Sequence, residues 1–350
     1  MPPSDLRCND CGCRFPLDRY DRDARRVRCP ECGAAVRVGG GAYPDRPRKS
    51  SAAKWIVVAV VLVILLVGGC CGGLIGLVWL EIRPTPFPEQ TEDYVQARAG
   101  FQTALTSKGP APQPFAPEAV PAGVSEVGYP SGKLQLKAWM NPPPPGAKNP
   151  AVLYLHGGFA FDSTDWDQCK PFRDAGFVTM VPLLRGENGQ AGNFTLFYDE
   201  VDDVVAAGEA LAKTPGVDPN RVFVAGHSAG GTLAMLGAMA SSRFKGCASF
   251  SGSPDQPAFV RGNPGLAPFD ESDGVELRMR SPLAFPKSFK CPARLYWGDD
   301  EIEFRFATRR LADRARAAGQ DVQAIEIPGD HTTAVGPAMQ QAVTFFRAVK

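Results

Sequence analysis

The sequence lacks several features that would point to common classes of function. Its 38 basic and 37 acidic residues nearly cancel, so the net charge of +1 gives no sign of a nucleic-acid partner, and none is expected for the large domain at residues 124–350. Neither glycine-rich phosphate-binding pattern, GxGxxG or GxxxxGK[ST], occurs, and no repeat of solenoid or propeller period is visible. Histidine is scarce, with three residues in 350, so any chemistry that needs an imidazole has few candidates.

Cysteine is present in a pattern that predicts a metal site. Two CxxC pairs, Cys8 with Cys11 and Cys29 with Cys32, are separated by a spacer of zinc-ribbon length. Each pair can present two thiolates to one tetrahedral ion, which favours zinc over redox-active or unpaired thiols. Cys13 lies just outside the first pair and is expected to be a spare thiol. A segment as short as residues 1–38 has almost no apolar core. We therefore expect the bound metal to supply its folding free energy.

Residues 55–80 form an apolar run without a single charge. As a helix it would be about 39 Å long, which exceeds a hydrocarbon core of about 30 Å, and Trp55 and Trp79 lie where interfacial aromatics belong. We therefore predict one transmembrane helix rather than a buried core helix or a cleaved signal. A lipoprotein-like alternative, with lipid attached at Cys70, stays open.

Charge around this run predicts its orientation. Glu81 and Arg83 nearly cancel on the carboxyl side, whereas the amino side carries Arg46, Arg48, Lys49 and Lys54. The positive-inside rule then places the ribbon in the cytoplasm and everything after Leu80 outside it. Reduced thiolates suit that compartment, and the outer part has only Cys169, Cys247 and Cys291.

Small residues within the run suggest a weaker possibility. Two glycine series repeat every four residues and would each share a helix face: Gly68, Gly72 and Gly76, and Gly69 and Gly73. Such faces let two membrane helices approach closely, so a homodimer is one hypothesis, and glycine merely tolerated in a membrane is the other.

The composition divides the chain into five segments: a ribbon (1–38), a flexible basic linker (39–54), the transmembrane helix (55–80), a proline-rich spacer with a short helix (81–123) and a large domain (124–350). The large domain opens with a hairpin pattern and then alternates buried-strand and helix patterns to its end. That alternation predicts an α/β fold with a doubly wound, mostly parallel sheet.

The stretch RVFVAGHSAGGTLAMLGAMA, residues 221–240, predicts a nucleophile at Ser228. A strand pattern precedes the serine and a helix pattern follows it, the context of a strained strand-to-helix elbow. Gly226 and Gly230 suit a turn in which backbone segments approach too closely for a Cβ. The helix starting at Ala229 would direct its amino-terminal dipole at an oxyanion on the substrate.

A serine hydroxyl needs a base, and we assign that role to His331. It lies in IPGDHTTAV, after the last strand, where this chain order requires the base. His227 adjoins Ser228 within the elbow and should point away from it. His156, in YLHGG, ends a strand and is expected to orient a loop.

The acid that orients the histidine should follow the penultimate strand, in ARLYWGDDEIEF. Asp299 is too close to the strand end, counting forward from the strand favours Glu301, and counting back from the next helix favours Asp300. We favour Asp300 because aspartate is the commoner orienter, with Glu301 as the alternative and Asp255 as a remote one.

The loop HGGF offers the remaining electrostatic element. Backbone N–H groups of Gly157 or Gly158 could join that of Ala229 around the developing alkoxide. This chemistry requires no cofactor, so zinc is expected only in the ribbon.

Four motifs together carry a family resemblance. YLHGG, GHSAGG, WGDDE and PGDH resemble, in order and approximate spacing, the α/β-hydrolase superfamily, and are most similar to its prolyl-oligopeptidase and dienelactone-hydrolase branches. The likeness covers residues 124–350, although no β-propeller precedes them. It implies a membrane-anchored carboxylesterase or peptidase that cleaves an ester, thioester or amide bond through an acyl-enzyme.

The alternative is a non-catalytic receptor or scaffold of the same fold that signals through the cytoplasmic ribbon. The presence of all three triad residue types favours the enzyme. The substrate is not readable, because its pockets are built from loops such as residues 253–285.

Overall fold

The computed structural model describes residues 5–9, 11–16, 26–32, 34–37, 92–146 and 148–349. The chain divides into two compact units, residues 1–76 and 77–350. The expected linker, the transmembrane helix with its glycine faces, and Cys70 lie outside the described residues. Among those that are described, no helix is both long and apolar enough to cross a membrane.

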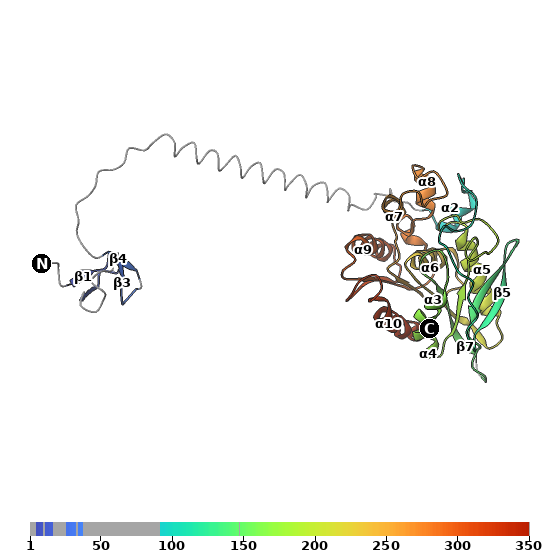
Figure 1. The fold of residues 1–350 in the computed structure, drawn as a ribbon, viewed down its shortest axis with the longest axis horizontal. Coiled ribbons are helices and arrows are strands. Elements are labelled where there is room, and N and C mark those ends of the chain that lie inside the picture. The colour runs from blue at the N-terminus through green and yellow to red at the C-terminus, as the bar shows by residue number, and fades with distance from the viewer. Residues whose placement is uncertain are drawn as a thin grey trace. The chain divides into compact units, whose positions relative to one another are not determined.

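The first unit contains two small antiparallel hairpins (Figure 1). Their strands are β1 (Asp5–Arg7) with β2 (Arg14–Pro16), and β3 (Arg26–Arg28) with β4 (Ala35–Arg37). A backbone hydrogen bond from the first cysteine closes the turn of each hairpin. Cys8 N donates to Cys13 O at 2.9 Å, and Cys29 N donates to Ala34 O at 2.7 Å. These tight turns bring the two thiols of each CxxC pair to the same side.

The second unit is built on an eight-stranded sheet in the order β12-β11-β10-β9-β7-β8-β6-β5. Strands β7 to β12 pair in parallel, and the hairpin β5–β6 adds to β8 in the antiparallel sense. Their bounds are β5 Ser125–Ser131, β6 Leu134–Met140, β7 Asn149–Leu155, β8 Val178–Pro182, β9 Val217–His227, β10 Cys247–Phe250, β11 Ala293–Gly298 and β12 Val322–Ile327. The predicted doubly wound, mostly parallel sheet is confirmed.

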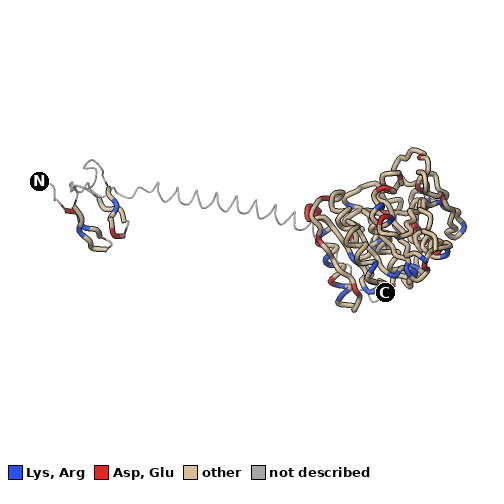
Figure 2. Tube along the Cα trace, turned by 90° about the horizontal axis from the view of Figure 1, so that it is seen from below, with Lys and Arg blue, Asp and Glu red and all other residues tan. Residues whose placement is uncertain are grey.

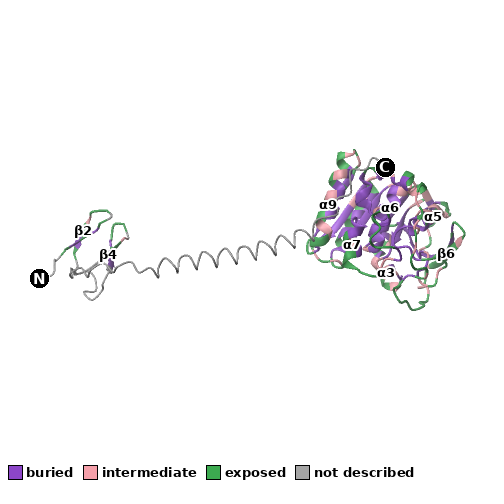
Figure 3. Cartoon of the chain, turned by 90° about the horizontal axis from the view of Figure 1, so that it is seen from above, coloured by how far each residue is buried: buried purple, intermediate pink, exposed green. Residues whose placement is uncertain are grey.

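Helices cover both faces of this sheet, and its central strands are largely buried, whereas the edge strands β5 and β12 are partly exposed (Figures 1 and 3). Alternate residues of β7 enter different cores: Leu153 packs in the core shared with α5, α6 and α9, and Tyr154 in the core shared with α4 and α10. A strand buried on both faces has no polar face, which explains its unbroken apolar sequence. The helices are α4 Lys170–Asp174, α5 Glu200–Lys213, α6 Ala229–Ala240, α9 Ile302–Ala317 and α10 Val335–Ala348.

Three segments differ from a simple alternation. The stretch DWDQCKPFRDAG, residues 165–176, has the pattern of one helix closed by Gly176, but it is split into α3 (Ser163–Gln168) and α4, because Pro171 has no N–H to continue the first helix. The region between β10 and β11 forms short helices: α7 Gln256–Gly262, α8 Gly274–Met279, η2 Pro282–Ala284 and η3 Pro286–Ser288.

The third difference concerns the proline-rich spacer. Its short helix is α2 (Tyr94–Ala99), and Tyr94 is fully buried in the core of the second unit. Residues from Tyr94 onward are therefore part of the folded domain rather than a stalk. Acidic and basic residues are interspersed along this domain (Figure 2).

Candidate active site

Ser228 lies at the turn between β9 and α6 with φ 54° and ψ −117°, a left-handed conformation that is strained for serine. The glycines around it are sterically required. A Cβ on Gly226 would lie 2.3 Å from Gly230 O, and one on Gly230 would lie 2.2 Å from Leu155 O. Ser228 is partly exposed, and its hydroxyl makes no hydrogen bond to the residues that the structure describes. The elbow geometry thus leaves Ser228 available to a substrate.

Strand order gathers the other candidate residues at the same edge. β7 and β9 are neighbours on either side of the point where the chain reverses its winding, and their carboxyl ends carry HGGF and Ser228. β11 and β12 are also neighbours and lead to Glu301 and His331. Such a switch point is where α/β sheets bind their ligands.

His331 lies beside the elbow. Its ring centroid is 4.7 Å from that of His227, and His227 Nε2 donates to the backbone carbonyl of His331 at 2.8 Å. Burial and the neighbouring His331 lower the pKa of His227 to about 4, so His227 is neutral and Nε2 carries its proton. His227 therefore holds the loop of His331. Sequence reasoning gave His227 no such role, because its partner lies 104 residues away.

The turn that carries His331 is held by Asp330. Its Oδ1 accepts the backbone N–H groups of Thr332 at 2.9 Å and Thr333 at 2.8 Å. These hydrogen bonds keep the pKa of Asp330 well below its usual range. The carboxylate thus fixes the backbone on the carboxyl side of the histidine.

Glu301 is the carboxylate against the histidine. Its Oε1 lies 2.5 Å from His331 Nδ1, and its side chain is only 4% exposed. The other oxygen accepts from Ser251 Oγ at 2.5 Å and Gly298 N at 2.6 Å. Burial alone would raise the pKa of Glu301, but the hydrogen bonds from His331, Ser251 and Gly298 outweigh it, so the net pKa is lowered. Glu301 is ionised and able to orient the imidazole.

The prediction that Asp300 is the acid that orients His331 is wrong, because Glu301 occupies that position. A turn closed by Glu301 N to Gly298 O at 2.9 Å folds the third residue after the strand back over the strand end. Asp300 lies exposed in that turn. Asp255, the remote alternative, accepts Ala258 N at 3.2 Å and caps α7. Ser251, from the neighbouring strand, was not predicted; nothing in its local sequence distinguishes it.

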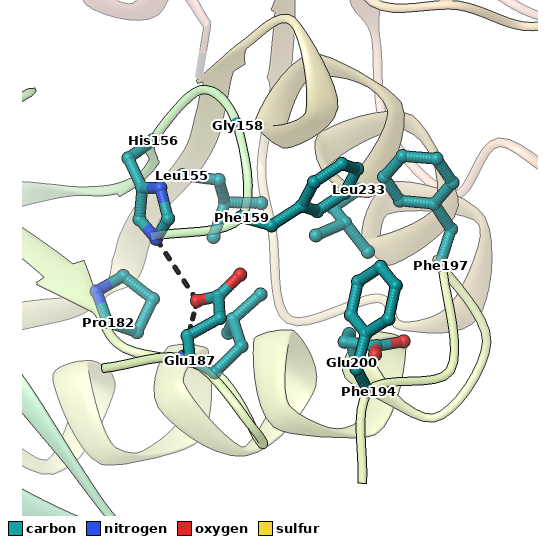
Figure 4. Close-up of a pocket in the computed structure, with 11 residues that line it drawn as sticks. Leu155, His156, Gly158, Phe159, Pro182, Glu187, Phe194, Phe197, Glu200 and Leu233 are labelled. Carbon is teal, nitrogen blue, oxygen red and sulfur yellow. Dashed lines mark hydrogen bonds and ion pairs between the residues drawn. The ribbon is translucent and has the colours of Figure 1, made fainter. Parts of the chain in front are cut away.

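The HGGF loop is anchored by a buried ion pair. His156 Nε2 lies 3.1 Å from Glu187 Oε2, as Figure 4 shows, while Nδ1 lies 2.9 Å from the carbonyl of Gly157. Two acceptors require both ring nitrogens to carry protons. Burial lowers the pKa of His156, but Glu187 raises it more, to a net value of about 9. The imidazolium thereby fixes the carbonyl of Gly157, the loop-orienting role expected for His156.

The contribution of the His156–Glu187 ion pair to the free energy of unfolding should depend on pH. Because the folded-state pKa of about 9 exceeds the ordinary 6.5, the stabilisation is complete below pH 6.5 and is lost as the pH rises through about 9. We expect the free energy of unfolding of the wild type to fall across this range relative to that of His156→Gln, measured by urea denaturation. His227→Gln serves as the control, since His227 does not titrate there. Parallel curves for wild type and His156→Gln would contradict the assignment.

One amide of this loop is a candidate donor to an oxyanion. The Gly158 N–H has no partner within the described part of the chain. A Cβ on Gly157 would lie 3.7 Å from Ser228 Cβ, which places this loop beside the nucleophile. Gly158 N–H is therefore our candidate to act with Ala229 N–H, at the start of α6, as an oxyanion donor.

A cavity of about 300 Å³ adjoins the histidine. The Phe304 ring stacks on His331, with centroids 5.5 Å apart, and also lines the cavity. Its wall combines apolar groups with two carboxylates and is formed by residues from α7, α9 and the end of β10: Ser253, Pro254, Asp255, Ala258, Phe259, Gly262, Asn263, Glu303, Phe304 and Ala307. This cavity is well placed to hold a group of a bound substrate.

The first unit brings its four candidate ligands together. The Sγ atoms of Cys8, Cys11, Cys29 and Cys32 all lie within 4.8 Å of one another. The Cys8–Cys32 and Cys11–Cys29 pairs are 3.6 and 3.5 Å apart. Thiolates about 2.3 Å from a tetrahedral Zn²⁺ lie about 3.8 Å from one another, so this donor set fits zinc.

Comparisons with known proteins support a serine hydrolase. Residues 163–261 match the model of the prolyl oligopeptidase family. The uncharacterized peptidase YtmA of Bacillus subtilis (strain 168) is 30% identical over 112 residues, which cover 32% of this chain and 44% of that protein. The match therefore spans less than half of that relative.

Two solved structures illustrate the likeness of fold. A puromycin-hydrolyzing peptidase of Mycobacterium tuberculosis has a TM-score of 0.54 and 22% identity, covering 65% of this chain and 39% of its own. The carboxylesterase EstE1, from a metagenomic library, has a TM-score of 0.54 and 21% identity, covering 73% and 94%.

The fold and the constellation at its switch point define a serine hydrolase of the α/β-hydrolase fold. Within that class, the segment containing the nucleophile is similar to the prolyl oligopeptidase family of peptidases. The predicted resemblance is thus confirmed for residues in the large domain.

Proposed function

We propose that this chain is a membrane-anchored serine hydrolase that cleaves ester or amide bonds through an acyl-enzyme. The observation that supports it best is the buried Glu301 carboxylate 2.5 Å from His331 Nδ1, beside a strained, partly exposed Ser228. A structural turn requires neither the strain nor the ionised acid.

The residues divide the reaction as follows. His331 Nε2 removes the proton of Ser228 as Oγ attacks the substrate carbonyl, and the tetrahedral oxyanion accepts hydrogen bonds from Gly158 and Ala229 N–H. His331 then protonates the leaving group, and the carbonyl re-forms as an acyl-enzyme. Water, activated by the same histidine, releases the acid and restores Ser228. Glu301 keeps Nδ1 protonated and stabilises the imidazolium throughout.

The cavity beside Phe304 suggests a small substrate group. About 300 Å³ suits a single side chain or a short acyl chain, and a wall of apolar groups with two carboxylates favours an amphipathic group. Short acyl esters and aminoacyl amides are therefore the substrates of choice for a first test.

The proposal is tested with a fluorophosphonate probe on the purified chain, followed by a panel of those two substrate types. Covalent labelling together with hydrolysis of at least one type is the expected result. A chain that neither labels nor hydrolyses any of them would instead favour the non-catalytic scaffold.

Membrane anchoring rests on residues 55–80 and the charges around them. With Thr91→Cys, a membrane-impermeant maleimide should label the introduced thiol in intact cells but leave the ribbon thiols unlabelled until the cells are permeabilised. Labelling of the ribbon thiols in intact cells would reverse the orientation. Cleavage before Cys70 with acylation would identify a lipoprotein.

Zinc is proposed for the ribbon alone. Its four thiolates would hold the ion, and the metal would supply the folding free energy of this small unit. EDTA should remove about one zinc per chain, measured by elemental analysis, and expose the segment before Val38 to proteolysis without changing hydrolysis. Cys11→Ser should lose the metal, whereas Cys13→Ser, outside the ligand set, should retain it. Activity that is lost in EDTA and restored by zinc would contradict this division.

A further inference from the structure

Residues 101–118, here called the arm, follow α2 and cross the domain before the first strand of the sheet. The arm starts against the region of α8, where Thr106 N donates to Pro268 O at 2.8 Å and Ala104 N to Glu276 Oε1 at 2.6 Å. It contains no helix or strand longer than an isolated bridge, yet it is pinned by hydrogen bonds along its length. Its course is therefore determined by partners in the domain.

The middle of the arm runs along the loop that carries Glu187. Ala111 N donates to Gly186 O at 2.9 Å, and Phe194 N donates to Gly109 O at 2.9 Å. Glu187 is also the residue that holds His156. The arm and the anchor of the HGGF loop thus share one scaffold.

The arm then reaches the HGGF loop itself through Gln113. Its Oε1 accepts the backbone N–H of Phe159 at 2.8 Å. The same oxygen would lie 2.5 Å from a Cβ on Gly158, whose φ is +64°, so the side chain packs directly on this glycine. Beyond it, Glu118 Oε2 accepts Ser163 N at 2.8 Å at the start of α3.

We infer that Gln113 is a positioning residue for the oxyanion-binding amide of Gly158. This inference rests on the proposed function. The Gly157 carbonyl is fixed by His156 on one side, and the Phe159 N–H is fixed by Gln113 on the other. The C=O and N–H of a trans peptide point in opposite directions, so these two bonds set both peptide planes that flank Gly158. A segment outside the sheet and its helices therefore completes the active site.

Gln113 should affect turnover more than stability. Its side chain is exposed, so its replacement leaves the core intact. Without the acceptor, the loop gains freedom at the amide that must meet a developing charge, and misplacement by a fraction of an ångström is costly for such donors. The hydrogen bond from Phe159 N–H to Gln113 should stabilise the transition state more than the bound substrate. Its loss should therefore lower kcat with little change in KM.

The test compares Gln113→Ala and Gln113→Met in the full chain. Methionine keeps the length and packing but removes the acceptor, and Gln102→Ala is the matched control, because Gln102 is an exposed glutamine of the same arm. Both Gln113 variants should lower kcat about tenfold with KM within about twofold of the wild type. They should also weaken binding of an aryl trifluoromethyl ketone, which forms the tetrahedral oxyanion, by a similar factor. Gln102→Ala should behave as wild type.

Each other outcome decides against the inference in a distinguishable way. Wild-type turnover and ketone affinity in Gln113→Met would show that the side chain only packs. Equal effects on KM and on the thermal midpoint, with no change in the ratio of ketone affinity to KM, would show a general structural role. A wild-type chain that neither labels with fluorophosphonate nor binds the ketone would overturn the proposed function and this inference together.

Discussion

Ser228→Ala is expected to abolish fluorophosphonate labelling and to lower kcat by about 10⁴-fold or more. The variant loses the only group that forms the acyl-enzyme, while the strained elbow and the oxyanion donors remain. Hydrolysis is measured with whichever ester or aminoacyl amide the wild type cleaves, and folding by the thermal midpoint, which should change little.

Ser242→Ala is the matched control for this experiment. Ser242 is exposed, just beyond the carboxyl end of the same helix, and lies far from the switch point in the sheet. It should label and turn over like the wild type. Undiminished hydrolysis by Ser228→Ala would show that another nucleophile carries the reaction.

Glu301→Gln is expected to lower kcat by about 10³- to 10⁴-fold, whereas Asp300→Asn should stay within about twofold of the wild type. The amide oxygen of glutamine can still accept from Ser251 and Gly298, so its NH₂ group is turned toward His331 Nδ1. A donor there favours the tautomer with its proton on Nε2, which cannot accept the proton of Ser228. The pair is a matched comparison, because the two carboxylates are adjacent in sequence and differ in their contact with the histidine.

The rate of fluorophosphonate labelling gives a second test of these two variants, because labelling of Ser228 also requires the base. The rate of labelling should fall in parallel with kcat in Glu301→Gln alone. A larger loss in Asp300→Asn would contradict the geometry described here. Small, equal losses in both variants would mean that His331 is oriented by other groups.

The elements of the large domain were predictable because each is encoded by local pattern. Residues 151–155 of β7 and 222–225 of β9 are buried on both faces, which requires an unbroken apolar run, and the amphipathic α9 carries its polar residues on one face. The split at Pro171 and the short helices between β10 and β11 were missed. Their boundaries depend on packing against neighbouring elements as much as on propensity.

The arm was the largest difference from expectation. Its prolines suggested a spacer, and its hydrogen bonds run to residues as distant as Glu276. No periodicity in its own sequence signals those partners, because irregular backbone is held by contacts rather than by a repeating ladder.

The sequence by itself was enough to predict Ser228 and His331 as candidate nucleophile and base, and to predict the cluster of four thiols. Gly226 precedes Ser228 because a Cβ there would meet the carbonyl of Gly230, four residues on, and each short CxxC turn brings its own two thiols to one side. These are steric and local constraints, which act wherever the chain is placed.

Only the tertiary structure decided which carboxylate lies against His331 and what the arm contacts. Asp300 and Glu301 are adjacent carboxylates, and the local sequence does not show which of them faces the histidine. The turn at Gly298 and the hydroxyl of Ser251, 50 residues away, select Glu301 by supplying the hydrogen bonds that a buried carboxylate requires. Choices between chemically similar neighbours are made by desolvation and by partners from distant strands, and these exist only once the sheet has formed.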